Sequence, residues 1–128
     1  EYGASTGRPR RVGPIDLVAT RYGCQIQGAT EVALTKLDIL SYMKEIPVCT
    51  QYEVNGEKTD DFPFTAVIDE AKPVLTTVPG WGCDISGVRK YEDLPQAARD
   101  YVEYVEKAIG VHISYVSVGA GRDEIIYR

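Results

Sequence analysis

The sequence predicts an α/β fold: a central, mostly parallel or mixed β-sheet flanked by helices, with ligand loops at the carboxyl ends of strands. Apolar runs typical of strands alternate with two segments at helical spacing. Polar or glycine-rich residues follow two of these runs, at residues 35–38 and 117–119. Internal repeats and low-complexity linkers are absent, so residues 1–128 are predicted to form a single α/β segment without a domain boundary.

The first half of the chain is predicted to hold one helix and three strands. The helix covers residues 14–27, since proline suits a first helical turn and Gly28 suits a stop. Strands follow over residues 32–37 and 46–54. Asn55-Gly56 is typical of a hairpin turn and leads into a strand at residues 57–59.

The second half begins with a strand at residues 73–78, which Pro79-Gly80 interrupts. A helix over residues 95–109 follows, capped by Asp93 or Leu94 and closed by a glycine. A last strand is predicted over residues 111–118. The helix carries an apolar stripe that indicates contact with the core: Ala98, Tyr101, Val102, Val105 and Ile109.

Residues 3–13 combine glycines, two hydroxyls and the guanidinium groups of Arg8, Arg10 and Arg11. Glycine lets a backbone approach a ligand, and guanidinium forks match carboxylate or phosphate groups through two bonds. The composition therefore predicts an anion-binding loop. A helix directly behind this loop would turn its positive end toward the ligand.

The apolar run before Lys36 and Asp38 ends in a pattern that suits a guanine base. One carboxylate can accept both the N1–H and the exocyclic amine of guanine, which adenine does not present. The methylene stem of a lysine can lie along the ring. The alternative is that Asp38 caps a short helix over residues 39–45. The four residues alone favour this alternative, because Lys-x-Asp is common by chance.

Composition limits the classes of function. The formal charge of −5 argues against a surface that tracks nucleic-acid phosphates, and no apolar run is long enough to cross a bilayer. The three cysteines, Cys24, Cys49 and Cys83, are widely spaced and suit reduced cytosolic thiols, so we expect a cytoplasmic protein. No metal site is expected, and the single histidine, His112, is expected to have a structural role at a strand entry.

Taken together, several motifs in this order resemble one family, adenylosuccinate synthetase, along essentially the whole chain. They are residues 5–11 (STGRPRR), 33–38 (ALTKLD), 79–81 (PGW), 84–89 (DISGVR), 116–119 (VSVG) and 121–123 (GRD). Departures from the family pattern occur at Val12, Pro14, Ala29 and Gly82-Cys83. None of them removes a ligand-contacting position.

The resemblance implies the C-terminal portion of this enzyme. The chain begins with Glu1 and contains no Gly-x-x-x-x-Gly-Lys-Ser/Thr phosphate loop. By this resemblance the family joins IMP and L-aspartate at the expense of GTP, with Mg²⁺ and the catalytic residues held by an N-terminal part. We therefore expect no catalytic residue here, no ligase activity of the chain alone, and a homodimer in the full-length family.

The same resemblance assigns roles by motif position. Residues 4–10 are expected to bind substrate, and Arg8 is expected to bind the aspartate carboxylates. Arg10 is also expected to lie near the GTP phosphate. Arg11 is assigned no ligand. The substrate-binding set is Ala4, Ser5, Thr6, Gly7, Arg8, Pro9 and Arg10, and the GTP-binding set is Arg10, Lys36, Leu37, Asp38, Ser117, Val118 and Gly119.

Two other functions remain open from the sequence. One is a free-standing guanine-nucleotide or anion-binding module without catalysis, and the other is a structural piece that completes a homodimer. Without the family resemblance, residues 117–121 are better interpreted as a glycine-rich exit turn. The length of the native gene product separates the alternatives, since a long upstream region with a phosphate loop favours the enzyme.

Overall fold

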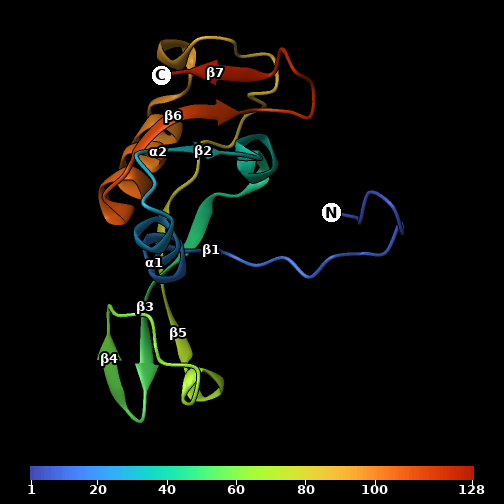
Figure 1. Cartoon of the computed structure of the whole chain (residues 1–128). Helices are drawn as coiled ribbons and strands as arrows, with labels where there is room; N and C mark the ends of the chain where they lie inside the picture. Colours follow the sequence, from blue (N-terminus) through green and yellow to red (C-terminus); the bar gives the residue numbers. More distant parts are fainter.

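The computed structural model describes residues 1–128 and divides the strands between two mixed sheets (Figure 1). In the first sheet the long strand β3 (Glu45–Val54) pairs with three others. Strand β1 (Ile15–Asp16) runs parallel to it, and β4 (Glu57–Thr59) and β5 (Lys72–Pro79) run antiparallel. The α/β class is confirmed, although the strands form two sheets and not one central sheet.

The second sheet has β6 (His112–Ser117) at its centre. Strand β2 (Glu31–Leu34) pairs with it in parallel, and β7 (Ile125–Tyr127) pairs with it antiparallel. Strand β7 was not predicted, because three residues with a single buried side chain, Ile126, are too few for a periodic pattern.

Helix α1 (Leu17–Gln27) begins three residues later than predicted. The residues before it, Ile15 and Asp16, pair with Val48 and Cys49 of β3 as a short strand. Asp16 then caps the helix, because its side chain accepts a hydrogen bond from the backbone N–H of Ala19 at 3.0 Å. The helix ends as predicted, with Gly28 in the left-handed conformation (φ 62°).

Helix α2 (Gln96–Ile109) follows Pro95, which takes the capping position predicted for Asp93 or Leu94. Its predicted apolar stripe is buried throughout.

The bounds of the five predicted strands agree with the structure to within three residues. The Asn55-Gly56 turn has the positive φ angles, 53° and 82°, of a tight hairpin.

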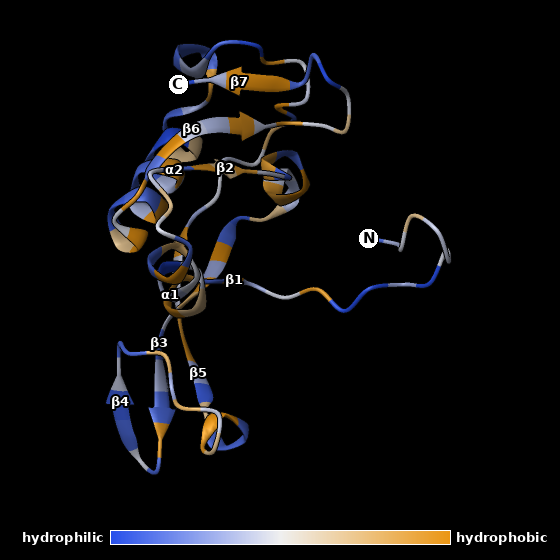
Figure 2. Ribbon diagram, in the orientation of Figure 1, coloured by the Kyte–Doolittle hydropathy of each residue, from blue (hydrophilic) through white to orange (hydrophobic).

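The main core consists of 15 buried residues, most of which come from both sheets and from α2. In Figure 2 hydrophobic colouring is found on β2, β6 and β7, whereas β4 is mostly hydrophilic. Burial of a valine or isoleucine side chain contributes about 1.5–3 kcal/mol, so this core holds β2 and β6 against α2.

None of the helices has the length and apolar character needed to cross a membrane. All three cysteines are free.

Candidate functional site

The two segments predicted to flank a nucleotide base lie at the same edge of the second sheet. Strands β2 and β6 are parallel, and Leu34 lies opposite Val116 near their carboxyl ends. Residues 35–38 and 117–119 therefore leave the sheet side by side, although about 80 positions separate them in sequence. This edge is where ligands bind in open α/β sheets.

Beyond β2 the chain turns sharply at Lys36, which has a left-handed backbone (φ 63°) without being glycine. Such a conformation costs on the order of 1–3 kcal/mol and is typical of functional sites. Leu37 is buried and opens a 3₁₀ helix, η1 (Leu37–Tyr42). Lys36 occupies the capping position and Asp38 lies in the first turn without a side-chain hydrogen bond. The alternative in which Asp38 caps a helix over residues 39–45 is wrong.

The motif at residues 79–81 forms hydrogen bonds with η1 and with the residues that follow it. Trp81 Nε1 donates to Ser41 Oγ at 3.0 Å, and the backbone N–H of Gly80 donates to the Lys44 carbonyl at 2.8 Å. A Cβ atom on Gly80 would overlap the Met43 carbonyl oxygen, so only glycine allows this close approach. This motif therefore helps to fix the position of η1, the 3₁₀ helix that contains Asp38.

The motif at residues 84–89 is stabilised by its own hydrogen bonds. Asp84 accepts from the backbone N–H of Ser86 at 2.9 Å, and this bond lowers the pKa of the Asp84 carboxyl. Arg89 donates to the carbonyls of Ser86 (2.6 Å) and Val88 (2.9 Å), and Ile85 is fully buried. These contacts hold residues 84–89 in a loop.

At the end of β6, the chain bends over residues 117–119. Ser117 Oγ donates to the Gly119 carbonyl at 2.7 Å, and the buried Val118 donates its N–H to the Glu124 carbonyl at 2.9 Å. These bonds fix the backbone at the sheet edge next to Lys36 and Asp38.

The predicted anion loop lies on an arm, residues 1–14, that extends away from the sheets (Figure 1). An isolated bridge between Tyr2 and Pro9 closes it, and the N–H of Gly3 donates to the Arg8 carbonyl at 2.9 Å. The guanidinium groups of Arg8 and Arg11 are exposed and unpaired. The helix expected directly behind this loop is α1, but it begins three residues later than predicted, because Ile15 and Asp16 form β1 and Asp16 caps the helix.

Glu1 connects the arm with the sheet edge, a role that no sequence pattern predicted. Its carboxylate lies 2.5 Å from Lys36 Nζ and 3.4 Å from Arg10 Nη1. The hydrogen bond from Lys36 is the largest cause that lowers the pKa of Glu1. Two cationic side chains that are predicted to bind ligands, Arg10 and Lys36, therefore contact the same carboxylate although they come from distant segments.

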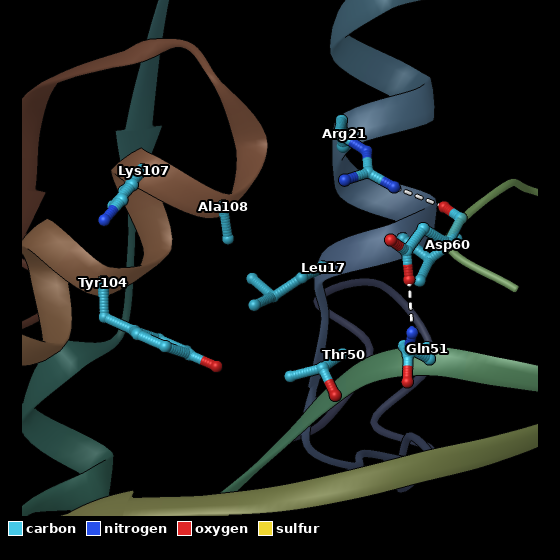
Figure 3. Close-up of a pocket in the computed structure, with 9 residues that line it drawn as sticks. Leu17, Arg21, Thr50, Gln51, Asp60, Tyr104, Lys107 and Ala108 are labelled. Carbon is cyan, nitrogen blue, oxygen red and sulfur yellow. Dashed lines mark hydrogen bonds between the residues drawn. The ribbon is translucent and has the colours of Figure 1, made fainter. Parts of the chain in front are cut away.

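A pocket of about 540 Å³ lies elsewhere, between α1, α2 and β3 (Figure 3). Asp60 occupies one side, where it accepts from Arg21 through its carbonyl and from Gln51 Nε2 at 2.6 Å through its carboxylate. None of the predicted ligand residues lines this pocket. No three histidine, cysteine or carboxylate side chains gather as a metal site anywhere in the structure.

Comparisons with known proteins agree on one family. A family profile described as adenylosuccinate synthetase matches residues 1–126. Adenylosuccinate synthetases from Bifidobacterium adolescentis and Salinibacter ruber are 49% and 50% identical over 127 residues, 98% of this chain. The structure of fully ligated adenylosuccinate synthetase from Plasmodium falciparum superposes with a TM-score of 0.93 over the whole chain, at 33% identity.

The chain spans only part of these relatives. It covers 30% of the B. adolescentis protein, 29% of the S. ruber protein and 31% of the P. falciparum chain.

Proposed function

This chain belongs to the adenylosuccinate synthetase family, a family of ligases, and we propose that it is the C-terminal, substrate- and GTP-binding portion of such an enzyme. The complete enzyme would join IMP and L-aspartate to give adenylosuccinate, with GTP converted to GDP and phosphate. The purine 6-oxygen is a poor leaving group until it is phosphorylated, and the aspartate amine then displaces phosphate. Such transfer depends on positioning and on charge neutralisation.

The parallel pairing of β2 with β6 is the observation that carries the proposal. In the proposed site, the Asp38 carboxylate accepts the two donors of guanine, and residues 117–119 offer backbone groups near the ring carbonyl. The free Asp38 side chain supports this role, because a carboxylate already engaged in a cap would have less capacity to accept. Lys36 and Leu37 complete the pocket, with the Lys36 stem along the ring.

The arm is proposed to bind the anionic substrates. Residues 4–10 are exposed, and Arg8 has no protein partner that would compete with the aspartate carboxylates. Arg10 shares Glu1 with Lys36, which supports a position of Arg10 near the GTP phosphate at the same edge. A guanidinium group is suited to both tasks because it forms paired, charge-assisted bonds.

Mg²⁺, which the family resemblance implies, does not fit the residues of this chain, since no group of three potential ligands is present. We propose that its ligands, together with the acid–base residues, belong to the portion of the relatives that this chain does not span. The homodimer and the cytoplasmic location are likewise proposals from the family. A free-standing binding module remains the alternative if the native product begins near Glu1.

The experiment uses a complete enzyme in which this chain replaces the matching segment of the B. adolescentis relative. Asp38→Asn substitutes an amide with one acceptor and one donor, which mismatches guanine but suits xanthine, where a carbonyl replaces the amine. Unpaired buried groups cost on the order of 1–3 kcal/mol, so kcat/KM should shift from GTP toward XTP by at least about tenfold.

Asp69→Asn provides the matched control. Asp69 also lies in the first turn of a 3₁₀ helix, η2 (Ile68–Glu70), but it is exposed and has no side-chain hydrogen bond. The control should leave the GTP-to-XTP ratio unchanged. If a folded Asp38→Asn enzyme keeps the same ratio as well, guanine recognition by Asp38 is wrong.

A further inference from the structure

In the loop that joins β6 to β7, the carboxylate of Glu124 packs against the backbone of the turn. The Glu124 side chain folds back so that Oε2 accepts the backbone N–H of Gly121. A Cβ atom built on Gly119 would lie only 2.6 Å from Glu124 Oε1, and one on Gly121 would lie 2.8 Å from Oε2. The carboxylate therefore occupies the space that two side chains would otherwise fill, and it packs against the backbone of both glycines.

Glu124 also closes the loop through its main chain. Its carbonyl accepts from the Val118 N–H at 2.9 Å, and its own N–H donates to the Gly121 carbonyl at 3.1 Å. Both backbone bonds survive any substitution at this position except proline. A change of the side chain thus removes one bond and the packing under the glycines, while the strand pairing of β6 and β7 is retained.

We propose that Glu124 is a positioning residue that holds residues 117–119 in the conformation required to recognise a guanine base. The inference rests on the proposed function of this sheet edge. Backbone groups read a base only when they are held in place, because an ordered loop loses less conformational entropy on binding. Ser117 already ties its hydroxyl to the Gly119 carbonyl, and Glu124 fixes the following residues.

The test is steady-state kinetics of the same complete enzyme with three variants. Glu124→Ala removes the acceptor, and Glu124→Asp keeps the charge but is one methylene too short to reach Gly121. Both should raise the KM for GTP by about tenfold, as expected for a loop that must be ordered on binding. The KM values for IMP and aspartate, and kcat, should stay within about twofold. Glu124→Gln keeps a side-chain carbonyl as acceptor and should restore the KM for GTP to within about threefold.

Asp123→Ala is the matched control, because this exposed carboxylate also lies beside Gly121, with Oδ1 2.9 Å from the position of a Cβ atom there, but it accepts no hydrogen bond. It should leave the KM for GTP unchanged. In the ligand-free chain, hydrogen exchange of the Gly121 amide should be about tenfold faster in Glu124→Ala and Glu124→Asp than in the parent. Asp123→Ala should not accelerate it.

The outcomes separate this inference from the function on which it rests. If Asp38→Asn shifts nucleotide preference but neither Glu124→Ala nor Glu124→Asp changes the KM for GTP, the positioning role is wrong and the guanine site stands. An equal loss in Glu124→Gln and Glu124→Ala, or a rise in all three KM values together, also overturns the role. If none of the Asp38 and Glu124 variants alters nucleotide kinetics, both proposals fail.

Discussion

Replacement of Glu106 by glutamine should destabilise the fold in a pH-dependent way, because one carboxylate oxygen holds three groups at the start of β6. Glu106 Oε2 accepts the Ile113 backbone N–H at 2.7 Å, lies 2.9 Å from His112 Nδ1 and accepts from Arg128 Nη1. The hydrogen bond from Arg128 is the largest cause that lowers the pKa of Glu106, from 4.5 to about 2. Glutamine retains one acceptor but loses the charge.

The direction and size of this pH dependence follow from the difference between the pKa of Glu106 in the folded and unfolded states. The folded protein binds fewer protons than the unfolded chain between the two pKa values, so this stabilisation is complete above about pH 5 and is lost as the pH falls toward 2. The difference of about 2.5 units corresponds to about 3 kcal/mol. Because the side chain is 25% exposed, solvent screens the pair, and we expect about 2 kcal/mol at pH 7.

Urea denaturation of the chain, followed by circular dichroism at pH 7 and pH 3, measures this difference. The destabilisation by Glu106→Gln should fall to less than half of its pH 7 value at pH 3, where the unfolded carboxyl is already protonated. Glu103→Gln, an exposed position on the same helix without a hydrogen bond, is the control. An effect equal to that of the control, or equal at both pH values, would show that the charge of Glu106 does not stabilise the fold.

Three further outcomes are expected. In the complete enzyme, Arg8→Lys should lose about 1.5–3 kcal/mol of aspartate recognition with GTP affinity little changed, because the planar fork is lost; an unchanged KM and kcat for aspartate would contradict this. Gly80→Ala should lower the free energy of unfolding by more than about 2 kcal/mol in urea, whereas Gly87→Ala, with open space around it, should have little effect. The 128-residue chain alone should form no adenylosuccinate, measured by absorbance against a sample without protein.

The sequence alone determined where the two helices end, one hairpin turn and the buried face of α2. Glycines at positions 28 and 110 end the two helices in left-handed conformations, and Asn55-Gly56 forms the predicted hairpin turn. The spacing of apolar residues identified the buried face of α2. Each of these features depends on residues within a few positions of one another, so their backbone preferences and periodicity act without the rest of the fold.

The tertiary structure alone decided how the candidate site is assembled. Parallel pairing places Leu34 opposite Val116, and no local preference specifies which distant strand becomes a neighbour. The same holds for the ion pair between Glu1 and Lys36, and for the division of the strands into two sheets. Packing of both sheets on α2 selects the partner strands, because burial of apolar surface depends on the whole core and not on the spacing within one segment.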